Sequence, residues 1–443
     1  MSHYTEDELS AYALSPEAIP DGEAVEQHVA ACHECRQTLD VIEAFDLALR
    51  DPLPWEAADS MPVRHEVPRQ LIDHARAIAV ADTYARDLVM PLVDSAIRFR
   101  EARIDEDPRF FTLAVVRLLC KVANGTHERQ PQFGLILADA ALSIAAKIAE
   151  TSGLPWCLGT AWKERANALR YLGRFRECEE ALDRADEAFQ SDEHVEAFDL
   201  AIVEYVRATL YCQMQRFDDA IAFARSAAAT FHVYGDTRRY LSALLVEALA
   251  YYSADRDNDA VILLDRVLPL ARSAEESGIL AHALANAANS YTRLRAYAKA
   301  TAYYADAIAL FDDLDLPTER ARTLWAMAAL RVEEGDYEEG LAGLERSRIE
   351  LNELGMANDA ALATLDLVAA LLAAGQPDRV PELCQIVSAT FFSEGMIRDG
   401  KKALAYLREA VTSGKATPEV VRHVRVFLDR LPLRPQGEFQ QIQ

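Results

Sequence analysis

The sequence predicts an all-α protein in which a small N-terminal helical domain precedes a long α-solenoid. Three observations support this prediction. Similar segments recur about every 40 residues after residue 105. No stretch alternates apolar and polar residues as a half-buried strand does. The composition, 51% hydrophobic and 26% charged residues, is that of a globular chain, and 443 residues are enough for two or three domains.

The N-terminal segment, residues 1–50, contains a group of metal-binding residue types. His28, Cys32 and Cys35 are spaced i, i+4 and i+7, so on a helix their side chains leave one face within two turns. His3 supplies a fourth donor near the start of the chain. Two imidazoles and two thiolates can close a tetrahedral, structural zinc site that leaves no position for water. The alternative is that both cysteines are small buried residues and that His28 is solvated.

This ligand order, together with the amphipathic stretch Glu8–Leu14, resembles the zinc-binding anti-sigma domain of bacteria. The resemblance covers residues 1 to about 50. It implies one structural Zn2+ and, as protein partner, a sigma factor of the extracytoplasmic-function type that the domain keeps from RNA polymerase. The implied metal ligands are His3, His28, Cys32 and Cys35. The implied partner-facing residues include Leu9, Tyr12 and Leu14. Some members of the family bind no zinc and some use the thiols as a redox switch.

The formal net charge of −25 favours a basic protein partner over nucleic acid. Residues 1–60 hold fourteen Asp or Glu against two Arg. Such a surface repels phosphate groups, whose binding depends on Lys and Arg, and attracts a basic surface. A sigma factor is basic where it contacts promoter DNA, so an acidic inhibitor fits. Solubility alone accounts for the charge equally well.

The sequence predicts a soluble, cytoplasmic protein. We identify no apolar run long enough to span a bilayer, because the longest, Leu365–Ala374, is short and contains Asp366. The N-terminus lacks the charged-then-apolar pattern of a signal peptide. Five further cysteines are scattered among helical patterns and are expected to be reduced and mostly buried.

Residues 51–70 are predicted to form a linker between the N-terminal domain and the array. They contain Pro52, Pro54, Pro62 and Pro68 with acidic residues between them, a composition that disfavours a helix. Residues 71–104 are predicted to form a connecting helix or helices.

Residues 105–395 repeat a helix–turn–helix unit. An aromatic residue or its substitute recurs at the turn, first after 42 residues and then every 40 residues. These positions are Phe175, Phe217, Asp257, Tyr297, Tyr337 and Pro377. Small residues flank each turn at fixed distances, which lets the two helices cross closely. An earlier, less regular copy spans Leu113–Ala146. Capping helices are predicted within residues 396–432, and residues 433–443 form a tail without a core pattern.

The repeats resemble tetratricopeptide repeats in their longer, forty-residue form. The resemblance implies a superhelix whose concave face is lined by the first helix of each pair and binds a peptide or a second protein. The implied binding residues are Lys163, Asn167, Arg170, Tyr205, Tyr252, Asn289 and Arg293. The alternative is that these polar side chains are solvated or bridge neighbouring helices.

Together these features predict a cytoplasmic anti-sigma factor and transcription regulator that binds its sigma factor through the zinc domain. The array would sense a regulatory peptide or protein. The main alternative is a tetratricopeptide adaptor in which the zinc module is a second docking element, and a protease cutting the linker could provide the regulation. Oxidation of Cys32 and Cys35 is a further release mechanism. No phosphate-binding loop or nucleophile–base set is found, so no enzymatic activity and no direct binding to nucleic acid or membrane is expected.

Overall fold

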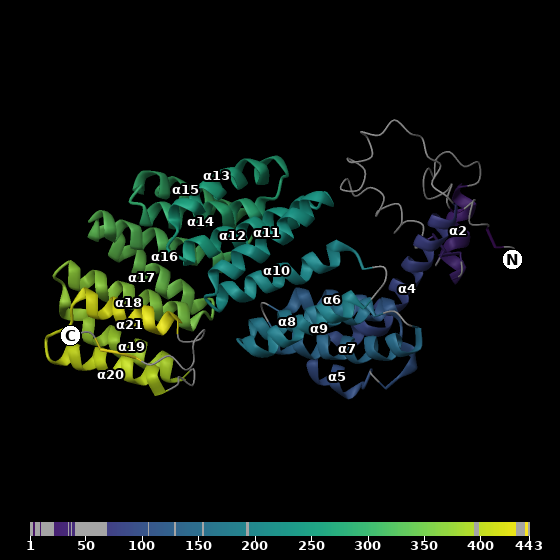
Figure 1. Ribbon diagram of the computed structural model, residues 1–443, viewed down its shortest axis with the longest axis horizontal. Helices are drawn as coiled ribbons and strands as arrows, with labels where there is room; N and C mark the ends of the chain where they lie inside the picture. The colour runs from purple at the N-terminus through teal and green to yellow at the C-terminus, as the bar shows by residue number, and fades with distance from the viewer. Residues whose placement is uncertain are drawn as a thin grey trace. The chain divides into compact units, whose positions relative to one another are not determined.

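The computed structural model describes residues 3–4, 9, 22–33, 35–36, 38–39, 69–104, 106–127, 130–152, 155–191, 195–393, 398–430 and 439–441. Within these ranges the chain is helical and contains no strand, which confirms the all-α prediction (Figure 1). The chain divides into two compact units, Met1–Ala168 and Leu169–Gln443. The predicted linker lies outside the described residues except for Arg69 and Gln70, which begin a helix.

Within the described residues, the first unit contains a short N-terminal helix and a bundle of helices from residue 69 onward. Its helices are α2 (Gly22–Ala31), α4 (Arg69–Val93), α5 (Ala96–Glu101), the 3-10 helix η2 (Pro108–Phe110), α6 (Leu113–Thr126), α7 (Pro131–Ser152) and most of α8 (Trp156–Tyr171). Helix α6 packs against both α4 and α7 around a core that includes Val89, Leu119 and Ile144. The predicted connecting segment, residues 71–104, thus holds two helices.

Helix α7 is a candidate membrane span that the sequence analysis did not identify. Among the described helices it is the one long and apolar enough to cross a membrane, over Pro131–Thr151 with a mean hydropathy of 1.5. Half of that window is buried. Its buried face packs on α6, and the core helix of a soluble protein passes the same test, so the finding is weak evidence for a membrane span.

The second unit is a stack of antiparallel helix pairs (Figure 1). Its helices are α9 (Phe175–Gln190), α10 (Ala197–Gln213), α11 (Phe217–Val233), α12 (Thr237–Ser253), α13 (Asp257–Ser273), α14 (Ser277–Arg293), α15 (Tyr297–Asp313), α16 (Pro317–Glu334), α17 (Tyr337–Glu353), α18 (Ala357–Ala373), η3 (Pro377–Arg379), α19 (Val380–Ser393), α20 (Arg398–Thr412) and α21 (Pro418–Arg430). Each predicted turn residue from Phe175 to Tyr337 is the first residue of a second helix.

A left-handed residue closes each turn from the end of α10 to the start of η3. Positive φ recurs at every twentieth residue, at Gln215, Gly235, Asp255, Glu275, Arg295, Asp315, Gly335, Gly355 and Gly375. After each such residue the chain makes the hydrogen bonds of a Schellman turn, as when Arg216 N donates to the carbonyl of Tyr211 at 2.8 Å. Helices of about 17 residues joined by these turns therefore set the 40-residue period.

Small residues at the helix crossings are buried, as the repeat pattern predicts. Ala208 and Ala288 are 0% exposed, and so are Ala220 and Ala260 on the second helices. Large side chains fill the last turns of the second helices, with Phe231 0% and Phe311 1% exposed. The core of the second unit is therefore a continuous seam between successive pairs.

Candidate functional site

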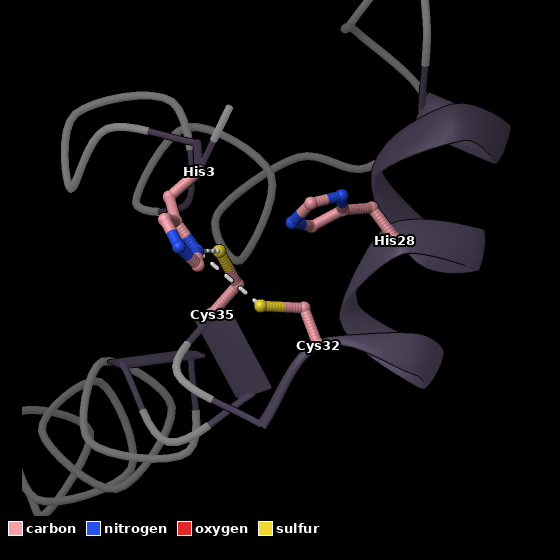
Figure 2. Close-up of side chains that lie close together, drawn as sticks. All are labelled: His3, His28, Cys32 and Cys35. Carbon is pink, nitrogen blue, oxygen red and sulfur yellow. Dashed lines mark hydrogen bonds between the residues drawn. The ribbon is translucent and has the colours of Figure 1, made fainter. Parts of the chain in front are cut away.

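Four side chains with metal-ligand atoms converge in the N-terminal part of the chain (Figure 2). One ligand atom from each of His3, His28, Cys32 and Cys35 lies within 4.8 Å of all the others. The Sγ atoms of Cys32 and Cys35 lie 3.3 and 3.6 Å from Nδ1 of His3. A tetrahedral zinc ion with bonds of about 2.1 Å to nitrogen and about 2.3 Å to sulfur separates such ligands by about 3.6 Å. The donor set therefore fits a tetrahedral metal ion.

The imidazole of His28 points to the same conclusion. Its Nε2 atom is buried and has no hydrogen-bond partner among the described residues. The other contacts of this ring are with rings, since Tyr4 lies edge-on at 5.0 Å and His3 at 6.3 Å between centroids. A buried nitrogen without a partner costs free energy, and coordination to a metal would remove that cost.

The backbone around the cysteines differs from the single regular helix that the spacing predicts. Helix α2 ends at Ala31, although Cys32 N still donates to His28 O at 2.8 Å and Arg36 N to Cys32 O at 3.1 Å. In Figure 2 the chain bends after Cys32, and Cys35 approaches from a separate helical segment. The bend directs both sulfur atoms toward the imidazole of His3.

A very small apolar core supports this cluster. It comprises Leu9, Val25, Val29, Cys35 and Leu39, each at most 9% exposed. Leu9, implied as partner-facing, belongs to this core at 1% exposed, and the other two implied partner-facing residues, Tyr12 and Leu14, lie outside the described residues. Among the described residues this core is small, and a bound metal ion would add to its stability.

The second candidate site is the inner face of the repeat array in the second unit. The first helices of successive pairs contact one another from α10 through α12, α14 and α16 to α18, whereas contacts between successive second helices are sparser. A solenoid curves toward its more closely spaced helices. These first helices therefore form the concave face, and they carry Tyr205, Tyr252, Asn289 and Arg293 as the repeat register predicts.

Arg293 and Tyr252 form one assembly across two repeats. The Arg293 guanidinium lies 3.7 Å from the ring centroid of Tyr252 and donates to the Tyr252 carbonyl at 2.7 Å and to Asp255 at 3.0 Å. Burial raises the pKa of the Tyr252 hydroxyl, and the Arg293 charge partly opposes that rise. Arg293 thus bridges helices, which is the alternative role that the sequence left open for it.

Asn289 and Tyr205 are half-buried on the same face. The Oδ1 atom of Asn289 accepts a hydrogen bond of 2.7 Å from the hydroxyl of Tyr304, which is 2% exposed. The Tyr205 ring packs against Phe231 at 6.5 Å between centroids. Both side chains are held in fixed positions by the fold.

A residue that the sequence analysis did not single out is Leu249 on α12. It is 41% exposed, although leucine on an array helix is ordinarily core. It lies 40 residues before Asn289, a position expected on the concave face. Leu245 and Val246, half-buried one turn earlier, continue the same face. The repeat register carried the signal that could have identified all three.

The candidates on α8 make contacts of a structural kind. Lys163 pairs with the buried carboxylate of Glu164, which also lies 3.2 Å from His127 Nε2. Burial favours the protonated acid, but Lys163 and His127 more than offset this and hold the pKa of Glu164 below its ordinary value. Arg170 is 9% exposed and stacks on the Tyr171 ring at 4.1 Å. Asn167 is half-buried.

The cysteines outside the N-terminal cluster are poor nucleophiles. Burial raises the pKa of Cys120 and of Cys178 to about 12, and that of Cys212 and of Cys384 to about 11. Burial also raises the pKa of Cys157. These thiols are therefore protonated at neutral pH.

Fold and site together define an all-α helical-repeat protein with a separate His/Cys cluster. No protein-family model and no curated protein matches the chain. Among solved structures, a Rap protein complexed with competence and sporulation factor is similar with a TM-score of 0.56 and 14% identity, over 82% of this chain and 99% of that one.

Two further solved structures give the same result. A signal transduction ATPase with numerous domains from Pyrococcus horikoshii, which has a tetratricopeptide repeat sensor, gives a TM-score of 0.53 and 12% identity over 98% of this chain and 64% of that one. Aspartyl phosphate phosphatase F from Bacillus subtilis gives a TM-score of 0.51 and 12% identity over 100% of this chain and 99% of that one. The likeness shows the fold, a tetratricopeptide-like α-solenoid.

Proposed function

We propose that this chain is a regulatory adaptor whose repeat array binds a peptide or a second protein along the concave face of the second unit. The observation that carries the proposal is the apolar strip of Leu245, Val246 and Leu249 on α12, in which Leu249 is 41% exposed. Exposed apolar surface on a concave face is typical of a binding site.

Polar groups beside this strip suit an extended backbone. Asn289, one repeat further along, uses its Oδ1 atom to accept from Tyr304, so its amide hydrogens are the atoms that would meet a ligand carbonyl. Tyr252 presents a ring fixed by Arg293. The fold shared with a Rap protein that was solved with competence and sporulation factor supports a binding role for such an array.

The test selects ligands from a random peptide library on the full-length protein and then measures their affinity for variants. Leu249→Glu is expected to weaken a selected peptide by at least about tenfold, since it places a charge in the apolar strip. Ile262→Glu on α13 is the matched control, because Ile262 is 63% exposed on a second helix. Equal affinity for both variants would contradict the proposal.

The N-terminal cluster would act as a second docking element of this adaptor. We propose that His3, His28, Cys32 and Cys35 hold one structural Zn2+, since the set already supplies four donors and leaves no place for a substrate. A non-catalytic, cytoplasmic role is consistent with this donor set and with the protonated thiols of the array.

The same cluster favours a second candidate function, sequestration of a sigma factor. The four donors follow the order that the sequence shares with anti-sigma domains. The test is pull-down of extracytoplasmic-function type sigma factors by the full-length protein with zinc, compared with a Cys32→Ser variant. Zinc-dependent capture of one sigma factor, with increased transcription of its genes on deletion, would support this function. Absence of capture by the zinc-loaded protein would leave the adaptor function alone.

A further inference from the structure

Helix α21 leaves the pattern of the solenoid and returns to its first helices. It packs against α18 as well as against its neighbour α20 (Figure 1). Its apolar face is fully used, since Val421 and Val424 are 0% and Leu428 2% exposed. The cluster that these residues join also contains Trp325 of α16, so α21 lies over two helices of the concave face.

One charged contact fixes the register of α21 on this surface. The Arg425 guanidinium lies 2.9 Å from Asp366 Oδ1, and Trp325 Nε1 donates to Asp366 Oδ2 at 3.0 Å. Arg425 also lies 5.5 Å from the Trp325 ring centroid. Burial raises the pKa of Asp366, and Arg425 is the main group that opposes this rise. A carboxylate so placed selects for a helix that brings a guanidinium to it.

The charges of Arg422 and Arg425 on α21 act on groups of the first helices. Glu333 on α16 has its pKa raised by burial, and Arg295 and Arg422 oppose that rise. Arg425 contributes to the electrostatic environment of Tyr252 on α12. The far side of α21 is solvent-exposed, with Val426 40% exposed. The helix therefore occupies one end of the concave face in the manner of an amphipathic helix bound in a groove.

We infer that the surface of α16 and α18 is a binding site for an amphipathic helix, and that α21 fills it until a partner helix displaces it. The partner helix carries an arginine with apolar residues four and one positions before it and three positions after it, which is the pattern of Val421, Val424, Arg425 and Leu428. This inference rests on the proposed function and names the class of partner.

The experiment uses full-length protein and a labelled peptide of residues 417–431. Val424→Asp releases α21, and Val426→Asp on its exposed side is the matched control. The released variant is expected to bind the peptide at least about tenfold more tightly than the wild type or the control. Adding Asp366→Asn to the released variant, or replacing Arg425 by Glu in the peptide, is expected to weaken binding by at least about tenfold.

A second measurement covers the case in which the released variant does not fold. Excess peptide added to the wild type is expected to increase amide hydrogen exchange in α21 and to leave α14 unchanged. Failure of the peptide to bind a folded released variant, or unchanged exchange in α21, would overturn the inference. Dimerisation of the released variant in place of peptide binding would also overturn it, because the occupant would then be a second copy.

The two proposals fail in distinguishable ways. If no selected peptide depends on Leu249, the proposed function is refuted. The peptide of residues 417–431 still reports on the α16–α18 surface in that case. If that peptide does not bind but Leu249-dependent ligands do, only the inference about α21 is refuted.

Discussion

Gly340 is a position where the repeat pattern and the packing make opposite predictions for alanine. The equivalent residues of three earlier repeats are Ala220, Ala260 and Ala300. By that register, Gly340→Ala should stabilise α17 by about 0.5–1 kcal/mol, because alanine loses less backbone entropy in a helix. A Cβ at Gly340, however, would lie 2.6 Å from Val332 Cγ2 and 2.9 Å from the Val332 backbone nitrogen.

The steric term should exceed the gain in helix propensity. A side chain could rotate away from the new methyl group, but the backbone nitrogen of Val332 can move only with α16. Inserting a methyl group into a packed contact costs about 1–3 kcal/mol. Gly340→Ala should therefore destabilise the second unit by about 0.5–2 kcal/mol, measured as a lower midpoint in urea unfolding followed by circular dichroism.

A matched control separates the two effects. Gly278 lies in α14, and a Cβ there would have no atom within 4 Å. Gly278→Ala should therefore raise the free energy of unfolding by up to about 1 kcal/mol, seen as a higher urea midpoint. The combination of Gly340→Ala with Val332→Ala should remain destabilised relative to Val332→Ala alone, because the backbone contact persists. If Gly340→Ala raises the midpoint as Gly278→Ala does, the packing argument is refuted.

Three further predictions concern turns, charge and metal. Gln215→Gly and Asp255→Gly should each stabilise the array by about 0.5–1 kcal/mol in urea unfolding, because these residues hold φ at 61° and 58°. Glu164 has a lowered pKa, so its contribution to stability is present above its ordinary pKa of 4.5 and is lost as the pH falls through the folded value. In thermal unfolding, Glu164→Gln should therefore lose less stability than the wild type as the pH is lowered from 5. We expect elemental analysis of the wild type to find one equivalent of zinc, which Cys32→Ser should remove and Cys212→Ser should retain.

The sequence predicts the array well because its spacing is a direct consequence of packing. Only small residues allow two helices to cross closely, so Ala208, Ala248 and Ala288 mark each crossing and are at most 1% exposed. The same logic does not identify Leu249, because a leucine on a helix is compatible with core and with an exposed strip. Its exposure depends on which residues of neighbouring repeats cover it, and no local pattern contains that information.

Ion pairs between repeats were unpredictable for a related reason. Arg207 donates to Asp183 at 3.0 Å and to Asp186 at 2.6 Å on the preceding helix. In the next repeat the equivalent position is Glu247, which accepts from Arg225 at 2.6 Å. The position is constant but the sign of the charge is reversed, so the sequence shows a charge at this register without showing its partner.

The sequence predicted which donors gather in the His/Cys cluster but did not predict the backbone that carries them. The i, i+4, i+7 spacing of His28, Cys32 and Cys35 depends only on helix geometry, and their side chains do converge. The end of α2 at Ala31 is not indicated by that spacing. The approach of His3, 25 residues before His28, is likewise set by the path of the chain and not by its spacing.

The contacts of the concave face decide which residues can recognise a ligand. Arg293 is already bound to Asp255 and stacked on Tyr252, and Asn289 already accepts from Tyr304. Polar side chains that are already bonded within the fold can orient a ligand but add little affinity, because breaking their contacts would offset the gain from new ones. Affinity must then come from surface that the fold leaves exposed, and the exposed large apolar side chain of α12 is Leu249. A ligand of this array should therefore be selected first by an apolar side chain, with polar contacts fixing its direction.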